Sequence, residues 1–275
     1  MGVVNVTPNS FSDGGAFFAE DAAVAHGLAL LAAGADILDV GGEATNPRAE
    51  PIGADEELRR VVPVVRRLAA AGATVSIDTT KAVVARAAVA AGATIINDVS
   101  GGLFDPAMAE AIGDATYIAG HLRGGSIAEV FSRERMAHQA ALDWRTVADE
   151  LADRLAALPA PARARAWVDP GLGFGKGGDP EVNLALIRHS GDLGARLGRP
   201  VVIGASRKRF VRRAFAIGEP VADPVADPDN RVVDRAAELA ALDAASVTAT
   251  LDAIAAGANV VRVHNVALLR TALAL

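Results

Sequence analysis

Polar side chains that a buried core would not select stand at the end of almost every short apolar segment of the chain. Most of them are carboxylates and carboxamides, and a few cations and histidines accompany them. A buried carboxylate costs several kcal/mol unless a ligand or a water molecule satisfies it. Gathered in one place, these groups predict a pocket for a nitrogen-rich polar ring and an anion. They are Asn5, Asp39, Asp78, Asn97, Asp98, His121, Asp169, Ser206, Arg207, Lys208, Arg262 and His264.

Two kinds of chemistry can be distinguished among these residues. Asp78, Asn97 and Asp169 offer acceptors and amide donors that pair with the edge of an aminopyrimidinone. For any single residue, capping of the following helix is an equally good interpretation. The recurrence of polar residues after so many segments nevertheless favours a ligand-binding site. The groups that supply positive charge for an anion, or a cation over a planar ring, are Lys208, Arg262 and His264.

Composition limits the class of protein and its partners. A chain of 275 residues that is 51% hydrophobic fits one large α/β domain better than two small ones. A formal net charge of -6 argues against a nucleic-acid partner, and the lack of Cys suits a reducing cytoplasm. No apolar run reaches the roughly 18 residues that cross a bilayer, and no signal peptide is recognisable. We therefore expect a cytoplasmic protein without a membrane partner.

Hydrolase motifs such as H-E-x-x-H and G-x-S-x-G do not occur, so zinc or serine hydrolase chemistry has no support. Two Gly-rich segments, "VSGG" (99–102) and "DPGLGFGKGG" (169–178), would let backbone approach a ligand closely. The second is not a Walker loop, which needs a longer spacing, and a Gly-rich turn after a strand is more often only a turn.

The arrangement of short apolar runs and Ala-rich helical patterns predicts the fold. Four of the predicted strands begin within a recurring phrase, in which a helix ends at Gly and the strand follows directly. The phrases are "AAGADILDV", "AAGATVSID", "AAGATIIND" and "AAGANVVRV". Eight strand–helix units favour a single (β/α)8 barrel over residues 1–275, with an open doubly wound sheet as the rival. The carboxyl ends of barrel strands meet at one mouth, which would collect the polar residues.

The predicted strands cover 2–6, 37–40, 74–77, 94–97, 115–119, 166–168, 200–203 and 259–263. Helical patterns cover 20–33, 55–71, 80–91, 105–112, 143–158, 181–197, 207–217 and 234–256, and a last one starts at 266. Two segments, 120–142 and 218–231, are longer than such connections need, and the second has the composition of an exposed insertion.

Seven segments in order resemble the dihydropteroate synthase family over essentially the whole chain. They are "MGVVNVTPNSFSDGG", "ILDVGGEAT", "SIDTTK", "INDVSGG", "DPGLGFGK", "GASRKRF" and "VRVHN". The resemblance implies a (β/α)8 transferase of folate biosynthesis. Such an enzyme joins (7,8-dihydropterin-6-yl)methyl diphosphate to 4-aminobenzoate, needs Mg2+, is a sulfonamide target and commonly forms a homodimer through its late helices.

The resemblance also implies roles for individual residues. Asn5 would ligate Mg2+ on the diphosphate, and Arg262 would stack over the pterin ring. Asp39, Asp78 and Lys208 would form the catalytic set. The pterin diphosphate would be held by Thr45, Asp78, Asn97, Asp169, Lys208, Arg262 and His264. The aminobenzoate would be bordered by Thr45, Phe174 and Ser206.

The chain departs from the family pattern at several positions. Ala44 and Asn46 stand where the family usually has Ser and Arg, and we hypothesise that Arg48 replaces the missing charge. Gly120 stands for a frequent Met, which predicts a looser floor under the pterin. Asn9 and Asn265 each replace a frequent Asp.

Two other functions fit parts of this pattern. A pterin-dependent methyltransferase barrel would share the pterin-facing Asp and Asn, but would not need the "SRK" segment or the opening loop. A non-catalytic pterin-binding paralogue is suggested by Asn46 and Gly120. Release of diphosphate with 4-aminobenzoate would separate the synthase from this paralogue.

Overall fold

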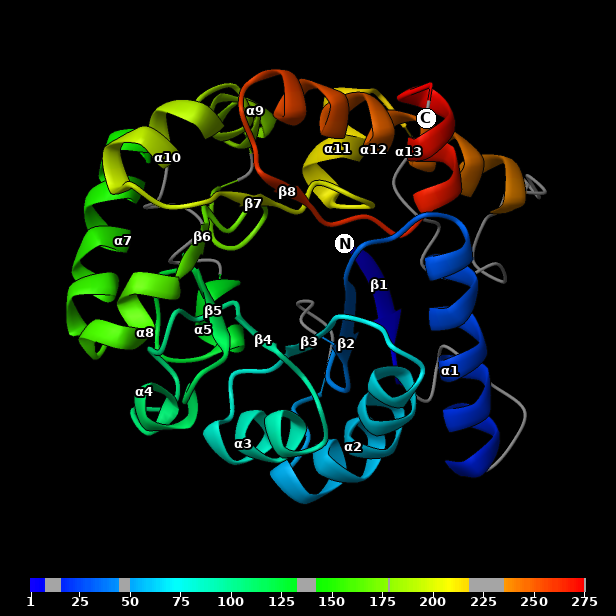
Figure 1. Ribbon diagram of the computed structural model, residues 1–275. Coiled ribbons are helices and arrows are strands. Elements are labelled where there is room, and N and C mark those ends of the chain that lie inside the picture. Colours follow the sequence, from blue (N-terminus) through cyan, green and yellow to red (C-terminus); the bar gives the residue numbers. More distant parts are fainter. Residues whose placement is uncertain (8–15, 45–49, 133–141, 178, 218–234, 275) are drawn as a thin grey trace.

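The computed structural model describes residues 1–7, 16–44, 50–132, 142–177, 179–217 and 235–274. Eight strands form a ring at the centre of the molecule, and helices surround the ring on its outside (Figure 1). Each strand starts and ends within one or two residues of its predicted range. The strands are β1 (Gly2–Asn5), β2 (Leu38–Gly41), β3 (Val75–Asp78), β4 (Ile95–Asp98), β5 (Thr116–Gly120), β6 (Trp167–Asp169), β7 (Val202–Ile203) and β8 (Val260–Val261).

The ring is closed by two short junctions between parallel strands. β1 to β6 form one six-stranded sheet in chain order, and β7 pairs with β8. A bridge between Val168 and Val201 joins β6 to the β7 segment, and another between Gly2 and Val263 joins the β8 segment to β1. The predicted (β/α)8 barrel is therefore confirmed, and the open doubly wound sheet is wrong.

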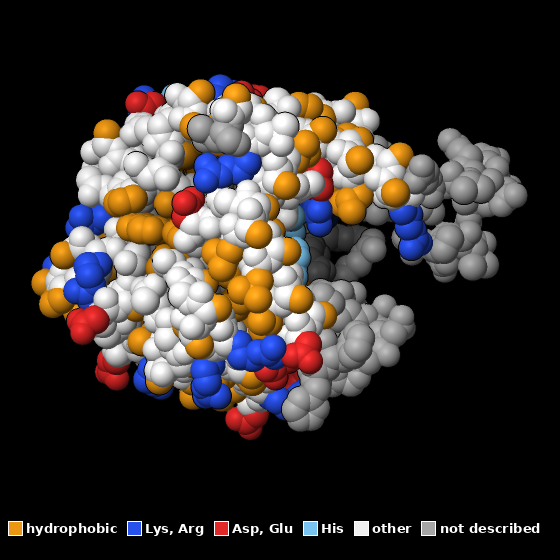
Figure 2. Space-filling model, turned by 45° about the vertical axis from the view of Figure 1, so that its right-hand side comes forward, with side chains coloured by type: hydrophobic (Ala, Val, Ile, Leu, Met, Phe, Trp, Pro, Cys, Tyr) orange, Lys and Arg blue, Asp and Glu red, His pale blue; other side chains and the backbone are white. Residues whose placement is uncertain are grey.

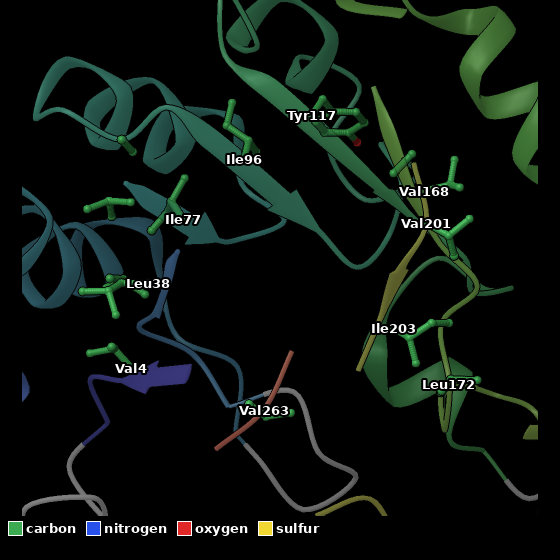
Figure 3. Packing of buried hydrophobic residues seen from close by; sticks show 14 of the residues in the cluster. Val4, Leu38, Ile77, Ile96, Tyr117, Val168, Leu172, Val201, Ile203 and Val263 are labelled. Carbon is green, nitrogen blue, oxygen red and sulfur yellow. The ribbon is translucent and has the colours of Figure 1, made fainter. Parts of the chain in front are cut away.

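Side chains of successive strand residues point alternately outward and into the barrel. The outward set packs against the helices in the main core, which includes Val4, Leu38, Ile77, Ile96, Tyr117 and Val168 (Figure 3). The inward set at the amino ends of the strands forms a second apolar cluster of Met1, Ile95, Ile118 and Val202. Further along each strand the inward positions become polar, so the interior is apolar at one end and polar at the other.

The helices cover the outside of the barrel, and none of those described is long and apolar enough to span a membrane. The predicted helix 181–197 is divided at His189, which takes a non-helical conformation. α5 and α8 were not predicted from the sequence. The helices are α1 (Ala16–Ala32), α2 (Ala54–Ala70), α3 (Ala82–Ala90), α4 (Met108–Ala111), α5 (Ile127–Val130), α7 (Trp144–Ala157), α8 (Ala160–Arg165), α9 (Pro180–Arg188), α10 (Ser190–Leu197), α11 (Arg209–Ala214), α12 (Arg235–Ala255) and α13 (Val266–Ala272).

The glycines of the repeated phrase adopt the left-handed conformation that was predicted for helix ends. Their φ angles are 97° at Gly34, 85° at Gly72, 114° at Gly92 and 97° at Gly257. A side chain with Cβ would be strained there. Each glycine turns the chain directly from a helix into the next strand.

Gly120 ends β5 and packs closely against the backbone at the end of β4. An added Cβ would lie 2.5 Å from the carbonyl oxygen of Val99 and 2.7 Å from that of Asp98. The guanidinium of Arg154 on α7 donates to the carbonyl oxygens of Gly120 and Leu122 and fixes this region from outside. The backbone at Val99 therefore fills the space beside Gly120, and a looser floor under the pterin stays a prediction.

We predict that Gly120→Ala lowers the free energy of unfolding by about 1–3 kcal/mol, because the methyl group meets backbone that cannot rotate away. Urea denaturation measures this change. Gly125→Ala is the matched control, since its added Cβ meets only the flexible Glu129 side chain at 3.4 Å. Equal stability of the two variants would contradict the close approach of β4 and β5.

Candidate functional site

A pocket of about 310 Å³ opens at the carboxyl ends of the barrel strands. Figure 2 shows a recess at the right-hand side of the molecule, with histidine at its edge. Most of the residues predicted from the sequence line the pocket. They are Asn5, Asp78, Asn97, Asp169, Phe174, Ser206, Arg207, Lys208, Arg262 and His264.

Arg262 connects the floor of the pocket across the barrel interior. Its Nε donates to Asp39 Oδ2 at 2.5 Å, and its Nη2 donates to Asp78 Oδ2 at 2.8 Å. Asn97 Nδ2 donates to the same Asp39 oxygen at 3.1 Å. Asp39 is fully buried and does not line the pocket, so it acts beneath the floor. Its second oxygen, Oδ1, has no hydrogen-bond partner in the described part of the chain.

The charges of the floor perturb one another. Burial raises the pKa of Asp78 to about 7, against the opposing attraction of Arg262, and repulsion from Asp39 adds to the rise. Burial disfavours the charged form of Arg262, but the carboxylates of Asp39 and Asp78 outweigh it and raise its pKa. The guanidinium is thus permanently charged, whereas Asp78 exchanges a proton near neutral pH.

Lys208 lines another part of the pocket and lies in the segment that follows β7. Its Nζ donates to the carbonyl oxygen of Leu172 and lies 4.7 Å from the ring centroid of Phe174. Burial lowers the pKa of Lys208 to about 8, while Asp169 opposes the change. Phe174 in turn contacts Phe131, with ring centroids 6.0 Å apart. An ammonium and an aromatic face therefore meet at one side of the pocket.

His264 and Ser206 form a fixed pair at the rim. The backbone N–H of His264 donates to Ser206 Oγ at 3.2 Å, and the hydroxyl lies 2.9 Å from His264 Nδ1. The hydroxyl therefore donates to Nδ1, and the neutral ring carries its proton on Nε2. Burial, with Arg262 and Arg207 nearby, lowers the pKa of His264 to about 3. The expectation of a positively charged His264 is wrong, because the ring is a neutral donor.

Arg207 is held away from an ordinary backbone conformation by α12. Its φ is 59°, unusual for a residue other than glycine. Its guanidinium makes two bonds to Asp243, at 2.7 and 2.9 Å. Asn265 also donates to Asp243, at 3.1 Å, and caps α13 through Leu268 N–H. Asp at position 265 would put a second carboxylate beside Asp243, whereas Asn makes a hydrogen bond.

Besides Asp39, two more residues predicted from the sequence lie outside the pocket. Asp98 accepts hydrogen bonds from Ser100, Gly102 and the Tyr117 hydroxyl, so it stabilises a turn on the outer side of β4. His121 lies on the outer side of β5, between Lys176 and Glu150. Neither residue lines the pocket, and neither caps a helix. The positions Asn9, Thr45, Asn46 and Arg48 and the segment 218–231 lie outside the described residues.

Six lining residues were not predicted from the sequence. Among them Glu43 binds Lys81 at 2.7 Å and accepts from Ile52 N–H at 2.9 Å. Its position two residues beyond β2, in "DVGGE", was the available signal. The others have side chains that carry no distinctive chemistry or follow a strand end by several residues. The six are Val3, Thr7, Glu43, Ala44, Val99 and Gly204.

Comparisons with known proteins agree with this geometry. A family model described as "Pterin binding enzyme" matches residues 1–264. The dihydropteroate synthase of Mycobacterium leprae (strain TN) is 48% identical over 223 residues, covering 78% of this chain and 75% of that protein. A longer relative, a probable bifunctional folylpolyglutamate synthase/dihydropteroate synthase of Haloferax volcanii, is 38% identical, and the chain spans 29% of its length.

Solved structures cover the whole chain. Xanthomonas albilineans dihydropteroate synthase with 4-aminobenzoic acid matches 100% of this chain and 90% of its own, at 38% identity and a TM-score of 0.79. Burkholderia cenocepacia dihydropteroate synthase complexed with 7,8-dihydropteroate matches 100% of this chain and 88% of its own, at 36% identity and a TM-score of 0.78.

The chain therefore belongs to the pterin-binding enzymes, and within them to the dihydropteroate synthases, which are transferases. The resemblance that the seven sequence segments indicated is confirmed. The names of these relatives favour the synthase over the methyltransferase alternative.

The two buried histidines predict a specific dependence of stability on pH. Burial lowers the pKa of both His264 and His121 to about 3, from the ordinary histidine value of about 6.5. Below pH 6.5 the unfolded chain binds protons that the folded protein excludes, so each histidine destabilises the fold as the pH falls from 6.5 toward 3. The limiting slope is about 1.4 kcal/mol per pH unit for each residue. Asp78 has the opposite sign, because its raised pKa lets the folded state take up a proton first.

Because Asp78 and the histidines act in opposite directions, the contribution of His264 is measured as the difference in pH dependence between the wild type and His264→Gln. Between pH 6 and 4 the wild type should lose about 1 kcal/mol more per pH unit than His264→Gln. Urea denaturation at a series of pH values measures both slopes. Parallel pH profiles would mean that His264 is not held neutral in the folded protein.

Proposed function

We propose that this chain joins (7,8-dihydropterin-6-yl)methyl diphosphate to 4-aminobenzoate and releases 7,8-dihydropteroate and diphosphate, with residues 1–275 acting as one domain. The observation that supports this proposal most strongly is the pocket at the mouth of the barrel. Its floor is the Asp39–Arg262–Asp78 network, and its rim is formed by cations and a neutral histidine. The Xanthomonas and Burkholderia structures support the substrate assignment, since they hold 4-aminobenzoic acid and 7,8-dihydropteroate.

The pterin ring would lie on the floor of the pocket. Asp78, Asn97 and Asp169 would pair with its ring and exocyclic N–H groups, and Lys208 would donate to its acceptors. Asn97 is 7% exposed, so its amide has few partners other than Asp39 and a ligand. Buried polar groups of this kind gain from a ligand with complementary donors and acceptors. Arg262, fixed by two carboxylates, would present its plane to the pterin face.

The diphosphate would lie at the rim between β1 and β8. The neutral His264 would donate its Nε2 proton to an anionic oxygen, since its Nδ1 is occupied by Ser206. A neutral donor costs less to desolvate than a cation and still recognises an anion. We propose that Asn5 is the protein ligand of Mg2+ on the same anion.

The chemistry at Asn5 fits a magnesium ion shared with the substrate. Its carboxamide offers a hard oxygen donor, and the side chain is exposed in the pocket. Mg2+ commonly keeps several waters and binds through one or two side chains plus phosphate oxygens. The described residues contain no group of three or more His, Cys, Asp or Glu that could hold a metal, consistent with a site completed by diphosphate. When bound, the ion would neutralise charge on the leaving group.

The aminobenzoate would approach from the side of the pocket that Phe174 and Ser206 border. The ring of Phe174 offers an apolar face for the benzoate ring, and Lys208 lies within 4.7 Å of the same ring. Thr45, the third residue proposed for this side, lies outside the described residues. A sulfonamide that imitates 4-aminobenzoate would compete for this subsite.

The arrangement favours a dissociative reaction. The C–O bond to the diphosphate breaks, and its electron pair leaves on the diphosphate oxygen. The pterin-methyl cation that remains is stabilised by the carboxylates of Asp78 and Asp39, which are already in place. The lone pair of the arylamine forms the new C–N bond, and the nitrogen then loses a proton to solvent or to diphosphate. A neutral amine needs mainly correct positioning, so no covalent enzyme intermediate is required.

We also propose a homodimer and a cytoplasmic location. The exposed Leu239 on α12 (43% exposed) supports a self-association surface on a late helix. The absence of cysteine from the chain is compatible with a reducing compartment.

The function is tested by diphosphate release with Mg2+, in the presence and absence of 4-aminobenzoate. The wild type should release diphosphate only when both substrates are present. Asp78→Asn should lower kcat/KM for the pterin diphosphate by about 100-fold or more, because an uncharged carboxamide cannot stabilise the developing cation.

Asp192→Asn is the matched control, since its carboxylate pairs only with the exposed His189 among the described residues. Its rate should equal that of the wild type. Calorimetric binding of pterin diphosphate by the wild type, with no release at saturating 4-aminobenzoate, would instead identify a non-catalytic binding protein.

A further inference from the structure

Lys176 is a buried cation that the proposed reaction does not use. Its side chain is 1% exposed, and it is one of three lysines in the chain. Burying an ammonium is costly unless its protons are satisfied and a counter-charge is near. The positions of its partners therefore indicate what its burial achieves.

All three protons of the Lys176 ammonium have acceptors. Nζ lies 2.9 Å from His121 Nδ1, 3.1 Å from the carbonyl oxygen of His121 and 3.1 Å from that of Phe174. None of these acceptors is charged. One bond is to the Gly-rich segment 170–177 itself, and two are to the residue that follows β5. Lys176 therefore ties this segment to the neighbouring strand.

A counter-charge besides Asp169 is reached through the His121 ring. Nδ1 of His121 accepts from Lys176, so the neutral ring carries its proton on Nε2 and donates it to Glu150 Oε2 at 2.9 Å. Hydrogen bonds from His121 and from Arg123 hold the pKa of Glu150 far below its usual range. A chain of bonds thus runs from the buried ammonium to a carboxylate on α7 whose side chain is 30% exposed.

The segment that Lys176 holds carries residues of the pocket. It begins after Asp169 and includes Phe174, both of which line the pocket. Its backbone is packed directly on β5, since an added Cβ at Gly171 would lie 1.8 Å from the carbonyl oxygen of His121. Asp169 is fixed by its strand, whereas Phe174 has no strand to hold it. Loss of the Lys176 bonds would therefore displace Phe174 more than Asp169.

We propose that Lys176, with His121 and Glu150, is a positioning device that sets the place of Phe174 and so the affinity for the aminobenzoate substrate. This inference rests on the proposed function for its substrate and adds residues that touch neither substrate. Lys176 does not act on the reacting atoms; it acts through the carbonyl of Phe174.

The first test asks whether a Lys176 variant changes the KM for 4-aminobenzoate without changing the KM for pterin diphosphate. Lys176→Met keeps a similar length and removes the three donors. Its KM for 4-aminobenzoate should rise about tenfold, as expected for the loss of a few net hydrogen bonds. The KM for pterin diphosphate should stay within about twofold, because the floor residues are held by strands. General destabilisation would not separate the two constants.

A second variant leaves the buried bonds in place. Glu150→Gln removes the counter-charge at the end of the chain while keeping an acceptor for His121. Burial lowers the pKa of Lys176 to about 7; Asp169 and Glu150 oppose this, and Lys208 and Arg154 add to it. Without the Glu150 charge, Lys176 loses its proton at lower pH. KM for 4-aminobenzoate should then begin to rise at a lower pH than in the wild type.

Asp149→Asn is the control for this variant. It removes the neighbouring carboxylate of α7, which is exposed and paired with Arg196. Its KM profile should coincide with that of the wild type. Coincidence of the Glu150→Gln profile with the wild type as well would overturn the role of Glu150 as counter-charge.

Nitrogen NMR of labelled histidine tests the hydrogen bonds from Lys176 through His121 to Glu150 without any turnover of substrate. His121 should show the neutral Nε2–H form in the wild type and should take its second proton at higher pH in Lys176→Met, because a nearby positive charge is removed. An unchanged His121 titration, or a proportional rise in both KM values, would overturn the proposal. A wild type that shows this histidine signature but releases no diphosphate would refute only the synthase function.

Discussion

The contacts of Arg262 with Asp39 and Asp78 join three strands across the interior of the barrel. Asp39 belongs to β2 and Asp78 to β3, whereas Arg262 follows β8, more than 180 positions further along the chain. Buried ion pairs repay their desolvation only when the geometry is good and the remaining polar atoms are satisfied. Here two carboxylates share one guanidinium, and one oxygen of Asp39 lacks a partner within the described residues. The floor therefore has an excess of negative charge that favours a cationic or N–H-rich ligand.

The barrel makes this arrangement possible because its interior changes character along the strands. The amino ends are filled by Met1, Ile95, Ile118 and Val202, which form a dry base. Asn5, Gly41, Asp78 and Asn97 occupy matching positions in successive strand pairs, nearer the carboxyl ends. Burial raises the pKa of Asp78, and the open mouth gives substrate access. The same layering thus supplies both stability and reactivity.

Much of this could be predicted from the sequence. The glycines at helix ends, the short apolar strands and the polar strand ends were sufficient for the barrel and for most pocket residues. Asp98 and His121 were placed in the site although strand alternation puts them outside. The side chain of Asn97 points inward, so Asp98 points outward, toward Tyr117. Position 120 faces inward, so His121 points outward, toward Glu150.

Other features depend on contacts between distant segments and have no local signal. The neutral state of His264 depends on burial and on Arg262 and Arg207 beside it. The packing at Gly120 depends on the backbone of Val99, and the burial of Lys176 depends on His121, 55 positions away. The motif "GFGK" indicated only a Gly-rich turn after a strand, whereas the structure shows a segment whose lysine is buried.

The network depends most on Asp39, which lies beneath the pocket floor and acts by holding Arg262 and through its negative charge. Calorimetric titration of Asp39→Asn with pterin diphosphate tests it most directly. Because a neutral amide holds the guanidinium less firmly and reduces the negative charge of the floor, the dissociation constant should rise about tenfold or more. A folded Asp39→Asn protein that binds pterin diphosphate as tightly as the wild type would contradict the central role of this network.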